Sequence, residues 1–178
     1  TSATIKGTLN IENVSNIIID HLNISANTGS AGANDGITIN NSKNIFITKC
    51  NVYDCTDGCI DHRTGATGVT ISWCKFYYTR DNGHNFVNLM GAADTDTPTG
   101  NVTYHHNWYS TMCKERMPLA RFGQVHMYNN YFACSGNNYC SWARLNSQLR
   151  MENNYYQSVK DSLRKYQVEE VGLKSDHL

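Results

Sequence analysis

Residues 101–110 read NVTYHHNWYS, residues 124–133 read QVHMYNNYFA and residues 148–157 read QLRMENNYYQ. Each stretch opens with alternating residues of the kind that form a half-buried β-strand. Each also has asparagine at its seventh position and an aromatic residue at its ninth. Three copies of one pattern at a nearly constant spacing indicate a repeating fold.

The same pattern continues toward the N-terminus of the chain. Three further copies begin at residues 16, 44 and 68, so the six copies start 23 to 33 residues apart. Repeats of this length are typical of solenoids, and leucine-rich repeats fall in the same range. Their framework of leucine and asparagine is missing here, and a parallel β-helix fits better. We therefore expect an all-β solenoid of roughly six to seven coils.

The alignment of the copies predicts which side chains stack on one another. Equivalent positions of successive coils of a β-helix lie about 4.8 Å apart. The seventh positions should form a column that ends in an asparagine ladder, and the ninth positions should fill the interior with aliphatic and then aromatic side chains. The two predicted columns are Leu22, Cys50, Cys74, Asn107, Asn130 and Asn154, and Ile24, Val52, Phe76, Tyr109, Phe132 and Tyr156.

Two regions depart from the repeat. The wide spacing between the copies at 68 and 101 predicts an inserted loop over residues 79–100, and such loops often carry binding sites. Residues 159–178 are rich in charge and are expected to be a C-terminal extension or a cap over the open end of the stack. We expect one domain that spans residues 1–178.

Composition narrows the classes of function. The formal net charge of the 178 residues is zero, so long-range attraction to nucleic acid or to an anionic membrane is not expected. No apolar run approaches the roughly 20 residues of a membrane span. Seven cysteines favour an oxidising compartment. Zinc at Cys55, Cys59 and His62 is disfavoured, because the spacing does not match the usual paired-cysteine pattern.

Three aspartates and two arginines are candidates for chemistry. Asp35 precedes a strand-like run, and Asp57 and Asp61 lie four residues apart in DGCID. Clustered carboxylates suit a hard cation such as Ca²⁺, although aspartates in ordinary turns have the same spacing. Arg116 and Arg121 flank a proline-containing stretch. Their planar guanidinium groups suit carboxylate ligands, although salt bridges to nearby aspartates would use them equally well.

The histidines are expected to be structural. His105 and His106 should be neighbours on one strand, so that they face opposite sides; one should pack inside or stack with asparagine neighbours, and the other should meet solvent. The same structural role is expected for His126.

DGCID with VTISW, then VTYHHNWY and RMPLARFGQVHMYNNYF, make the chain resemble the pectate lyases of polysaccharide lyase family one over roughly residues 35–156. The resemblance implies a right-handed parallel β-helix and cleavage of α-1,4-polygalacturonate by β-elimination, which gives 4,5-unsaturated oligogalacturonides. It implies that Asp35, Asp57 and Asp61 bind Ca²⁺, that Arg116 is the catalytic base and that Arg121 binds substrate. It also implies a secreted, extracellular protein, and we expect a monomer.

The chain departs from the family pattern at one position. The family usually has a substrate-binding lysine five residues before the glycine of its LxG motif, and here that place holds Phe86. Either Lys75 or Arg80 replaces the lysine from a shifted loop, or the substrate preference is altered. Typical members are also longer, with more coils before the first copy. Two alternatives stay open: a lyase for methyl-esterified pectin, and a non-catalytic carbohydrate-binding β-helix.

Overall fold

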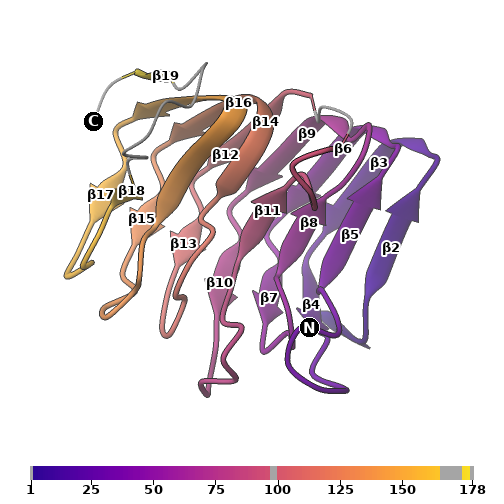
Figure 1. Ribbon diagram of the computed structural model, residues 1–178. Coiled ribbons are helices and arrows are strands. Elements are labelled where there is room, and N and C mark those ends of the chain that lie inside the picture. Colours follow the sequence, from indigo (N-terminus) through magenta and orange to yellow (C-terminus); the bar gives the residue numbers. More distant parts are fainter. Residues whose placement is uncertain (1, 97–99, 165–173, 177–178) are drawn as a thin grey trace.

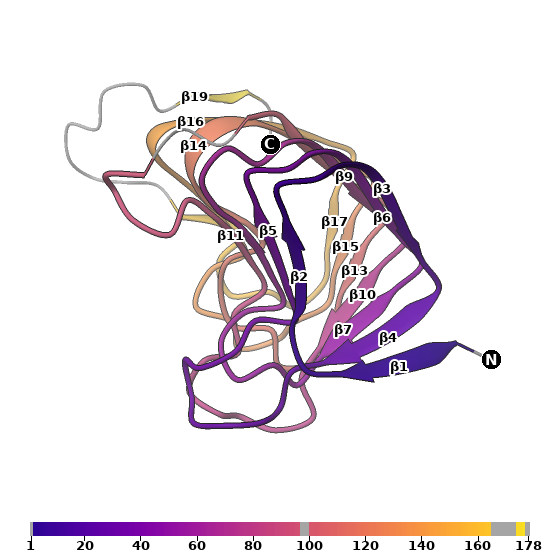
Figure 2. The ribbon, with the colours of Figure 1, turned by 90° about the vertical axis from the view of Figure 1, so that its right-hand side faces the viewer.

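The structure is a computed structural model that describes residues 2–96, 100–164 and 174–176. Within these residues every regular element is a β-strand and every strand pairing is parallel. No helix is present there, and hence none that could cross a membrane. The strands wind into the expected right-handed parallel β-helix (Figures 1 and 2). The all-β prediction is therefore confirmed.

The first of two sheets contains seven strands that follow one another along the solenoid axis, so six turns of the chain separate the first from the last. We call it the β7 face. Its strands are β1 (Ala3–Lys6), β4 (Leu22–Ser25), β7 (Asn51–Tyr53), β10 (Lys75–Tyr77), β13 (Trp108–Tyr109), β15 (Tyr131–Phe132) and β17 (Tyr155–Tyr156).

The second sheet bends over a corner and covers two sides of the solenoid. The long strands β14 (Leu119–Tyr128) and β16 (Ser141–Glu152) run across this corner and join the two sides. We call the first side the β8 face; its other strands are β2 (Leu9–Glu12), β5 (Ile37–Asn40), β8 (Ile60–His62), β11 (Asn88–Met90) and β18 (Leu163–Arg164). The second side is the β9 face, with β3 (Ser15–Asp20), β6 (Lys43–Thr48), β9 (Thr67–Ser72), β12 (Val102–His105) and β19 (Lys174–Asp176).

Both predicted columns are present. The pairing register aligns Ile24 with Val52, Val52 with Phe76, and so on to Tyr156. The aromatic half of that column stacks with ring centroids 4.5 to 5.2 Å apart. In the other column, the Asn107 side chain donates to Asn130 Oδ1 (3.1 Å), and the Asn130 side chain donates to Asn154 Oδ1 (2.9 Å). The asparagine ladder is therefore confirmed.

Each aligned copy turned out to contain two strands and the corner between them. The corner residue is the sixth of every copy, and it has a left-handed backbone with φ between 51° and 56°. These residues are His21, Lys49, Trp73, His106, Asn129 and Asn153. A left-handed residue reverses the local path of the chain, so one such residue turns the strand from the β9 face into the β7 face.

This corner overturns the prediction for the paired histidines. His105 ends β12, whereas His106 is the left-handed corner residue, so the alternation of a strand does not apply to the pair. Their Nδ1 atoms lie 2.9 Å apart, and both side chains are half-buried. His105 stacks on Tyr128 and His106 on Trp73, so neither histidine packs in the core.

The prediction of an inserted loop over residues 79–100 is wrong in part. This segment contains β11, which pairs with β8 on one side and β14 on the other and so completes a regular coil.

The C-terminal extension lies partly outside the described residues. In its described part, β18 and β19 each pair with β16 and continue the two halves of the second sheet. That residues 159–178 act as a cap stays a prediction.

Candidate functional site

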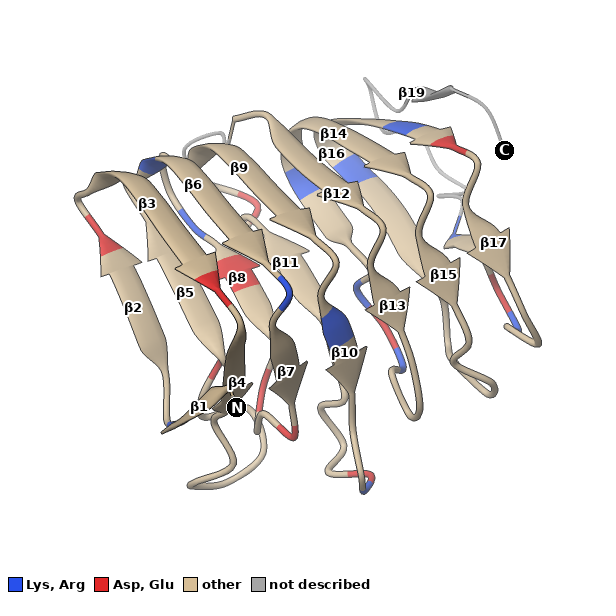
Figure 3. Cartoon of the chain, turned by 180° about the vertical axis from the view of Figure 1, so that it is seen from behind, with Lys and Arg blue, Asp and Glu red and all other residues tan. Residues whose placement is uncertain are grey.

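The three predicted aspartates gather at one place on the β8 face. Asp61 alternates with the core residues Ile60 and His62 along β8, so it points outward, and Asp35 lies just before the adjacent strand β5. Both side chains are nevertheless buried, at 4% and 5% exposure. Asp57, in the turn before β8, is partly exposed. Figure 3 shows acidic residues at β8 and basic residues on β14 and β16, which follow along the same sheet.

Two carboxylate oxygens converge on Gly58. Asp35 Oδ1 accepts a hydrogen bond from the Gly58 backbone N–H at 3.0 Å. A side-chain carbon added to Gly58 would lie 3.1 Å from Asp35 Oδ1 and 3.2 Å from Asp61 Oδ1. Asp61 Oδ1 is buried and has no hydrogen-bond partner. The missing side chain of Gly58 thus leaves a small space that two carboxylates face.

The electrostatics of this pair favour a bound cation. Burial, and then the charge of Asp35, raise the pKa of Asp61 well above its usual range. Burial also raises the pKa of Asp35, against the hydrogen bond from Gly58. Both carboxylates are therefore costly to ionise in the absence of a cation. A divalent cation with a preference for oxygen ligands would relieve that cost.

Two basic side chains already contact the aspartates. Arg63 Nη2 lies 3.0 Å from Asp35 Oδ2 and 3.9 Å from Asp61 Oδ2. His84 Nδ1 lies 3.4 Å from Asp57 Oδ1, so the Asp57 carboxylate is turned toward the histidine. Within the described residues, no three His, Cys, Asp or Glu side chains are placed to hold a metal ion as they stand. Asp35 and Asp61 therefore face a common space beside Gly58 that could hold a cation, whereas Asp57 is turned toward His84.

Arg116 lies farther along the same face, immediately before β14. Its backbone is left-handed (φ 62°), which costs energy for a residue other than glycine. Its guanidinium carbon lies 4.1 Å from the centre of the Phe86 ring, and its Nε is buried without a hydrogen-bond partner. Phe86, which lies where the resemblance places a lysine, therefore packs against Arg116, the predicted catalytic base. Such a cation–π contact also favours the charged form of the guanidinium.

Lys75 does not replace the missing lysine. It lies in β10 on the β7 face, and its Nζ lies 4.1 Å from the centre of the Trp108 ring and 4.9 Å from that of Tyr77. That part of the prediction is wrong, because alternation along β10 points Lys75 out of a different sheet. Arg80 is exposed in the loop that follows β10.

Arg121 is held by an acidic loop residue. In the pairing of β14 with β16 the register shifts between Ala120 and Phe122, and Arg121 alone lies opposite two residues of β16, Arg144 and Leu145. Its Nε donates to Asp94 Oδ1 at 2.7 Å, and its Nη1 donates to the Gly91 carbonyl at 2.7 Å. Arg144, one coil farther on, lies 3.4 Å from Asp94 Oδ2. β-Bulges are frequent beside active sites because they redirect side chains.

Three of these contact residues were missed at the sequence level: Arg63, Asp94 and Arg144. Arg63 had a usable signal, since it lies two residues after Asp61 and so faces the same side if the strand continues. Arg144 follows Arg121 by 23 residues, which is the spacing of one coil. Asp94 had no such signal, because its position depends on the path of a loop.

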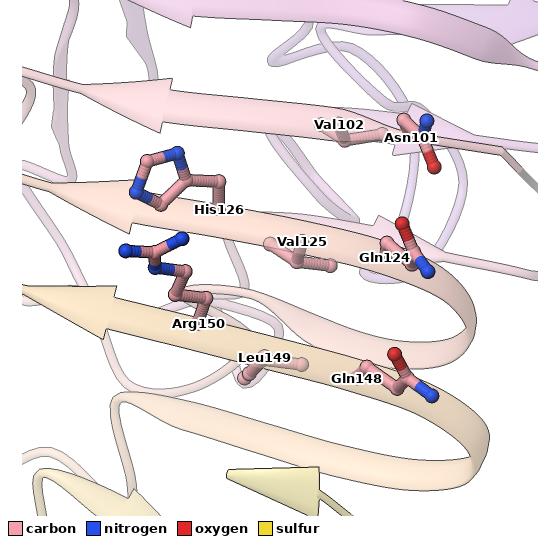
Figure 4. Close-up of a pocket in the computed structure, with 8 residues that line it drawn as sticks. All are labelled: Asn101, Val102, Gln124, Val125, His126, Gln148, Leu149 and Arg150. Atoms are coloured by element: carbon pink, nitrogen blue, oxygen red, sulfur yellow. The ribbon is translucent and has the colours of Figure 1, made fainter. Parts of the chain in front are cut away.

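A separate polar groove of about 380 Å³ lies on the β9 face (Figure 4). The amide side chains of Asn101, Gln124 and Gln148 line it together with His126 and Arg150. His126 Nε2 lies 2.6 Å from Glu152 Oε2, and Arg150 also pairs with Glu152. None of the predicted site residues lines this groove, so it is distinct from the aspartate and arginine site.

The sequence profile of the pectate lyase family matches residues 1–171. A pectate trisaccharide-lyase of Bacillus licheniformis is 34% identical over an alignment of 175 residues, and the match covers 92% of this chain and 48% of that protein. Pectate lyase B of Dickeya chrysanthemi is 34% identical over 165 residues, 84% of this chain and 41% of that protein. The chain thus spans about half the length of the curated relatives that it matches.

Solved structures agree with these sequence matches. Pectate lyase C from Erwinia chrysanthemi, studied at pH 9.5 with 30 mM Ca²⁺, superposes with a TM-score of 0.71 at 26% identity. The match covers 88% of this chain and 46% of that one. A pectate lyase from Bacillus sp. N165 in complex with trigalacturonate superposes with a TM-score of 0.62 at 29% identity, over 80% of this chain and 45% of that one.

Proposed function

Because the chain belongs to the pectate lyase family, we propose that it is a calcium-dependent pectate lyase that cleaves α-1,4-polygalacturonate by β-elimination. The observation that carries the proposal is the pair of buried aspartates that converge on Gly58, with one oxygen of Asp61 left without a partner. Basic residues follow on β14 and β16 of the same sheet (Figure 3). A chain of uronates laid along that face would meet first the acidic end and then the basic end.

Asp35 and Asp61 would hold Ca²⁺ on their Gly58 side, and Asp57 would add a third carboxylate. A bound calcium ion would neutralise the uronate carboxylate and make the proton on carbon 5 of the sugar more acidic. Arg63, which now contacts Asp35 and Asp61, would keep the remaining negative charge of the aspartates balanced. Calcium is thus proposed as the cofactor on the chemistry of the ligands, since hard cations prefer oxygen.

Arg116 would act as the base. It would take the proton from carbon 5, the electron pair would form the double bond between carbons 4 and 5, and the glycosidic oxygen on carbon 4 would leave with the electrons of its bond and take up a proton from water. A guanidinium must first lose a proton to do so, and neighbouring positive charge lowers that cost by disfavouring the cationic form. The Phe86 ring acts in the opposite direction, because it favours the cation. Phe86 would therefore fix the plane of Arg116 while making its deprotonation harder.

The proposal is tested on polygalacturonate, with calcium and with a chelator, by following the ultraviolet absorbance of the unsaturated product. Absorbance that rises with calcium and stops with chelator supports it. Activity on methyl-esterified pectin alone, insensitive to chelator, would make the protein a pectin lyase. Binding to pectate without any product would make it a non-catalytic carbohydrate-binding protein, the alternative that Phe86 favours.

Secretion and a monomeric state accompany this assignment as further proposals. They are supported by the resemblance to the family. Fractionation of the native host would test the first, and light scattering on the purified chain would test the second.

A further inference from the structure

Asp94 lies between two arginines that belong to successive coils. Its Oδ1 accepts from Arg121 Nε at 2.7 Å, and its Oδ2 lies 3.4 Å from Arg144 Nη2. The two arginine side chains are largely buried, at 16% and 18% exposure, whereas the Asp94 side chain is half exposed. A single contact between two exposed side chains would be an ordinary surface ion pair. Here one loop carboxylate instead lies between two cationic side chains that are largely buried.

Asp94 occupies the Nε side of the Arg121 guanidinium. A guanidinium grips a carboxylate through two adjacent N–H groups, either Nε with one Nη or the two Nη groups. Nε donates to Asp94, so the Nε fork is engaged, and Nη1 donates one of its two N–H groups to the Gly91 carbonyl. A uronate can gain both hydrogen bonds of the Nε fork only after the Asp94 carboxylate leaves.

Asp94 also has the chemistry of the group that it would exclude. Its carboxylate has the same charge and the same planar pair of oxygens as the carboxylate of galacturonate. The hydrogen bond from Arg121 lowers the pKa of Asp94, so it stays ionised where a uronate would be ionised. A methyl ester has neither the charge nor two equivalent acceptor oxygens, so it could not compete for the arginines in the same way.

We propose that Asp94 is a specificity-determining residue: its carboxylate occupies the position of a substrate uronate between Arg121 and Arg144, and pectate must displace it to bind there. This inference rests on the proposed function and refines it. Asp94 then weakens the binding of unesterified uronate at this position, while leaving the binding of an esterified sugar nearly unchanged. The protein would consequently prefer pectate over esterified pectin less strongly than it would if Arg121 and Arg144 did not contact Asp94.

The test compares Asp94→Asn and Asp94→Ala with Asp20→Asn. Asp20 lies at the end of β3 and contacts His21, so its variant removes one negative charge without touching the arginines. Steady-state rates are measured on polygalacturonate and on highly methyl-esterified pectin at saturating calcium. We expect both Asp94 variants to lower KM for polygalacturonate by about threefold to tenfold, the size of one released charge-assisted pair. Neither kcat nor the rate on esterified pectin should change by more than about twofold on the same reasoning.

The possible outcomes separate the inference from the proposed function. An unchanged or raised KM in both Asp94 variants, relative to Asp20→Asn, overturns the inference while turnover of pectate still supports the function. If Asp94 had a purely structural role, its substitution would raise KM and lower the melting temperature. Thermal unfolding of the variants would reveal that case. If the unaltered protein neither cleaves nor binds pectate, the proposed function fails and the inference fails with it.

Discussion

Asn130 is the residue whose removal should reveal most about what holds the solenoid together. Its side chain is 1% exposed and lies in the middle of the asparagine ladder. Oδ1 accepts from the backbone N–H and the side-chain amide of Asn107, at 3.0 and 3.1 Å. Nδ2 donates to the Tyr104 carbonyl and to Asn154 Oδ1, both at 2.9 Å. Asn130→Ala removes all four bonds and leaves their partners buried or, for Asn154, partly buried.

The expected cost follows from these contacts. A net contribution near 1 kcal/mol for each hydrogen bond gives a loss of about 4 kcal/mol in the free energy of unfolding. For a chain of this length that loss corresponds to a fall of roughly 10 °C in Tm. Because the total stability of a domain is typically about 5–15 kcal/mol, the variant should remain folded but only just.

The chain offers a matched control in Asn51. It also makes an asparagine-to-asparagine contact between coils, since its Nδ2 donates to Asn23 Oδ1 at 2.8 Å, but that contact is only partly buried on the outer surface. Asn51→Ala should cost less than about 1 kcal/mol, because water can replace the lost partner. Urea unfolding followed by circular dichroism gives both values. If Asn130→Ala lowers the free energy of unfolding by no more than Asn51→Ala does, the asparagine ladder sets the register of the coils but adds little stability. That result would refute the reasoning.

Three further predictions concern the site and the core. Asp57→Ala/Asp61→Ala should weaken calcium binding in calorimetry, and an unchanged affinity would exclude both residues as main ligands. Arg116→Lys should lower turnover about 100-fold through misplacement alone, with circular dichroism and calcium binding unchanged; near-normal turnover would exclude Arg116 as the base. Burial lowers the pKa of His62 from 6.5 to about 3, so the folded protein resists a proton that the unfolded chain accepts. Between those two pH values the free energy of unfolding should fall with decreasing pH by about 1.4 kcal/mol per pH unit from this residue. His62→Gln can keep the contact to Tyr104, and its free energy of unfolding should fall less steeply with decreasing pH. Equal slopes in the two proteins would contradict this.

The interior of the fold was predictable because stacking repeats one environment in every coil. The seventh and ninth positions each face the same neighbours in successive coils, so their residue types carry the register, from Ile24 to Tyr156 and from Asn107 to Asn154. The corner positions carried no comparable signal. Asn129 and Asn153 tolerate a left-handed backbone, but Trp73 at the equivalent corner does not prefer one, so residue type did not reveal that each copy turns there.

The ligands of the site were harder to predict than its scaffold. Asp61 is placed by the alternation of β8, which is a local rule, and its position on the outer side follows from sequence. The partners of the charged groups come from other coils and loops, as Asp94 shows for Arg121 and His84 for Asp57. Such pairings depend on the path of a loop over the sheet, and spacing along the chain does not encode that path.

Charge-balanced pairs and unsatisfied polar atoms lie together at the proposed reaction centre on the β8 face. Asp35 has Arg63, and Arg121 has Asp94, so their charges are balanced within the protein. Asp61 Oδ1 and Arg116 Nε, by contrast, are buried polar atoms without a hydrogen-bond partner. Burying such atoms costs free energy, and sites bear that cost where a ligand later supplies the missing contact. We therefore expect the cation and the substrate to supply the missing contacts of Asp61 Oδ1 and Arg116 Nε, whereas the balanced pairs around them set how readily a charged substrate can enter.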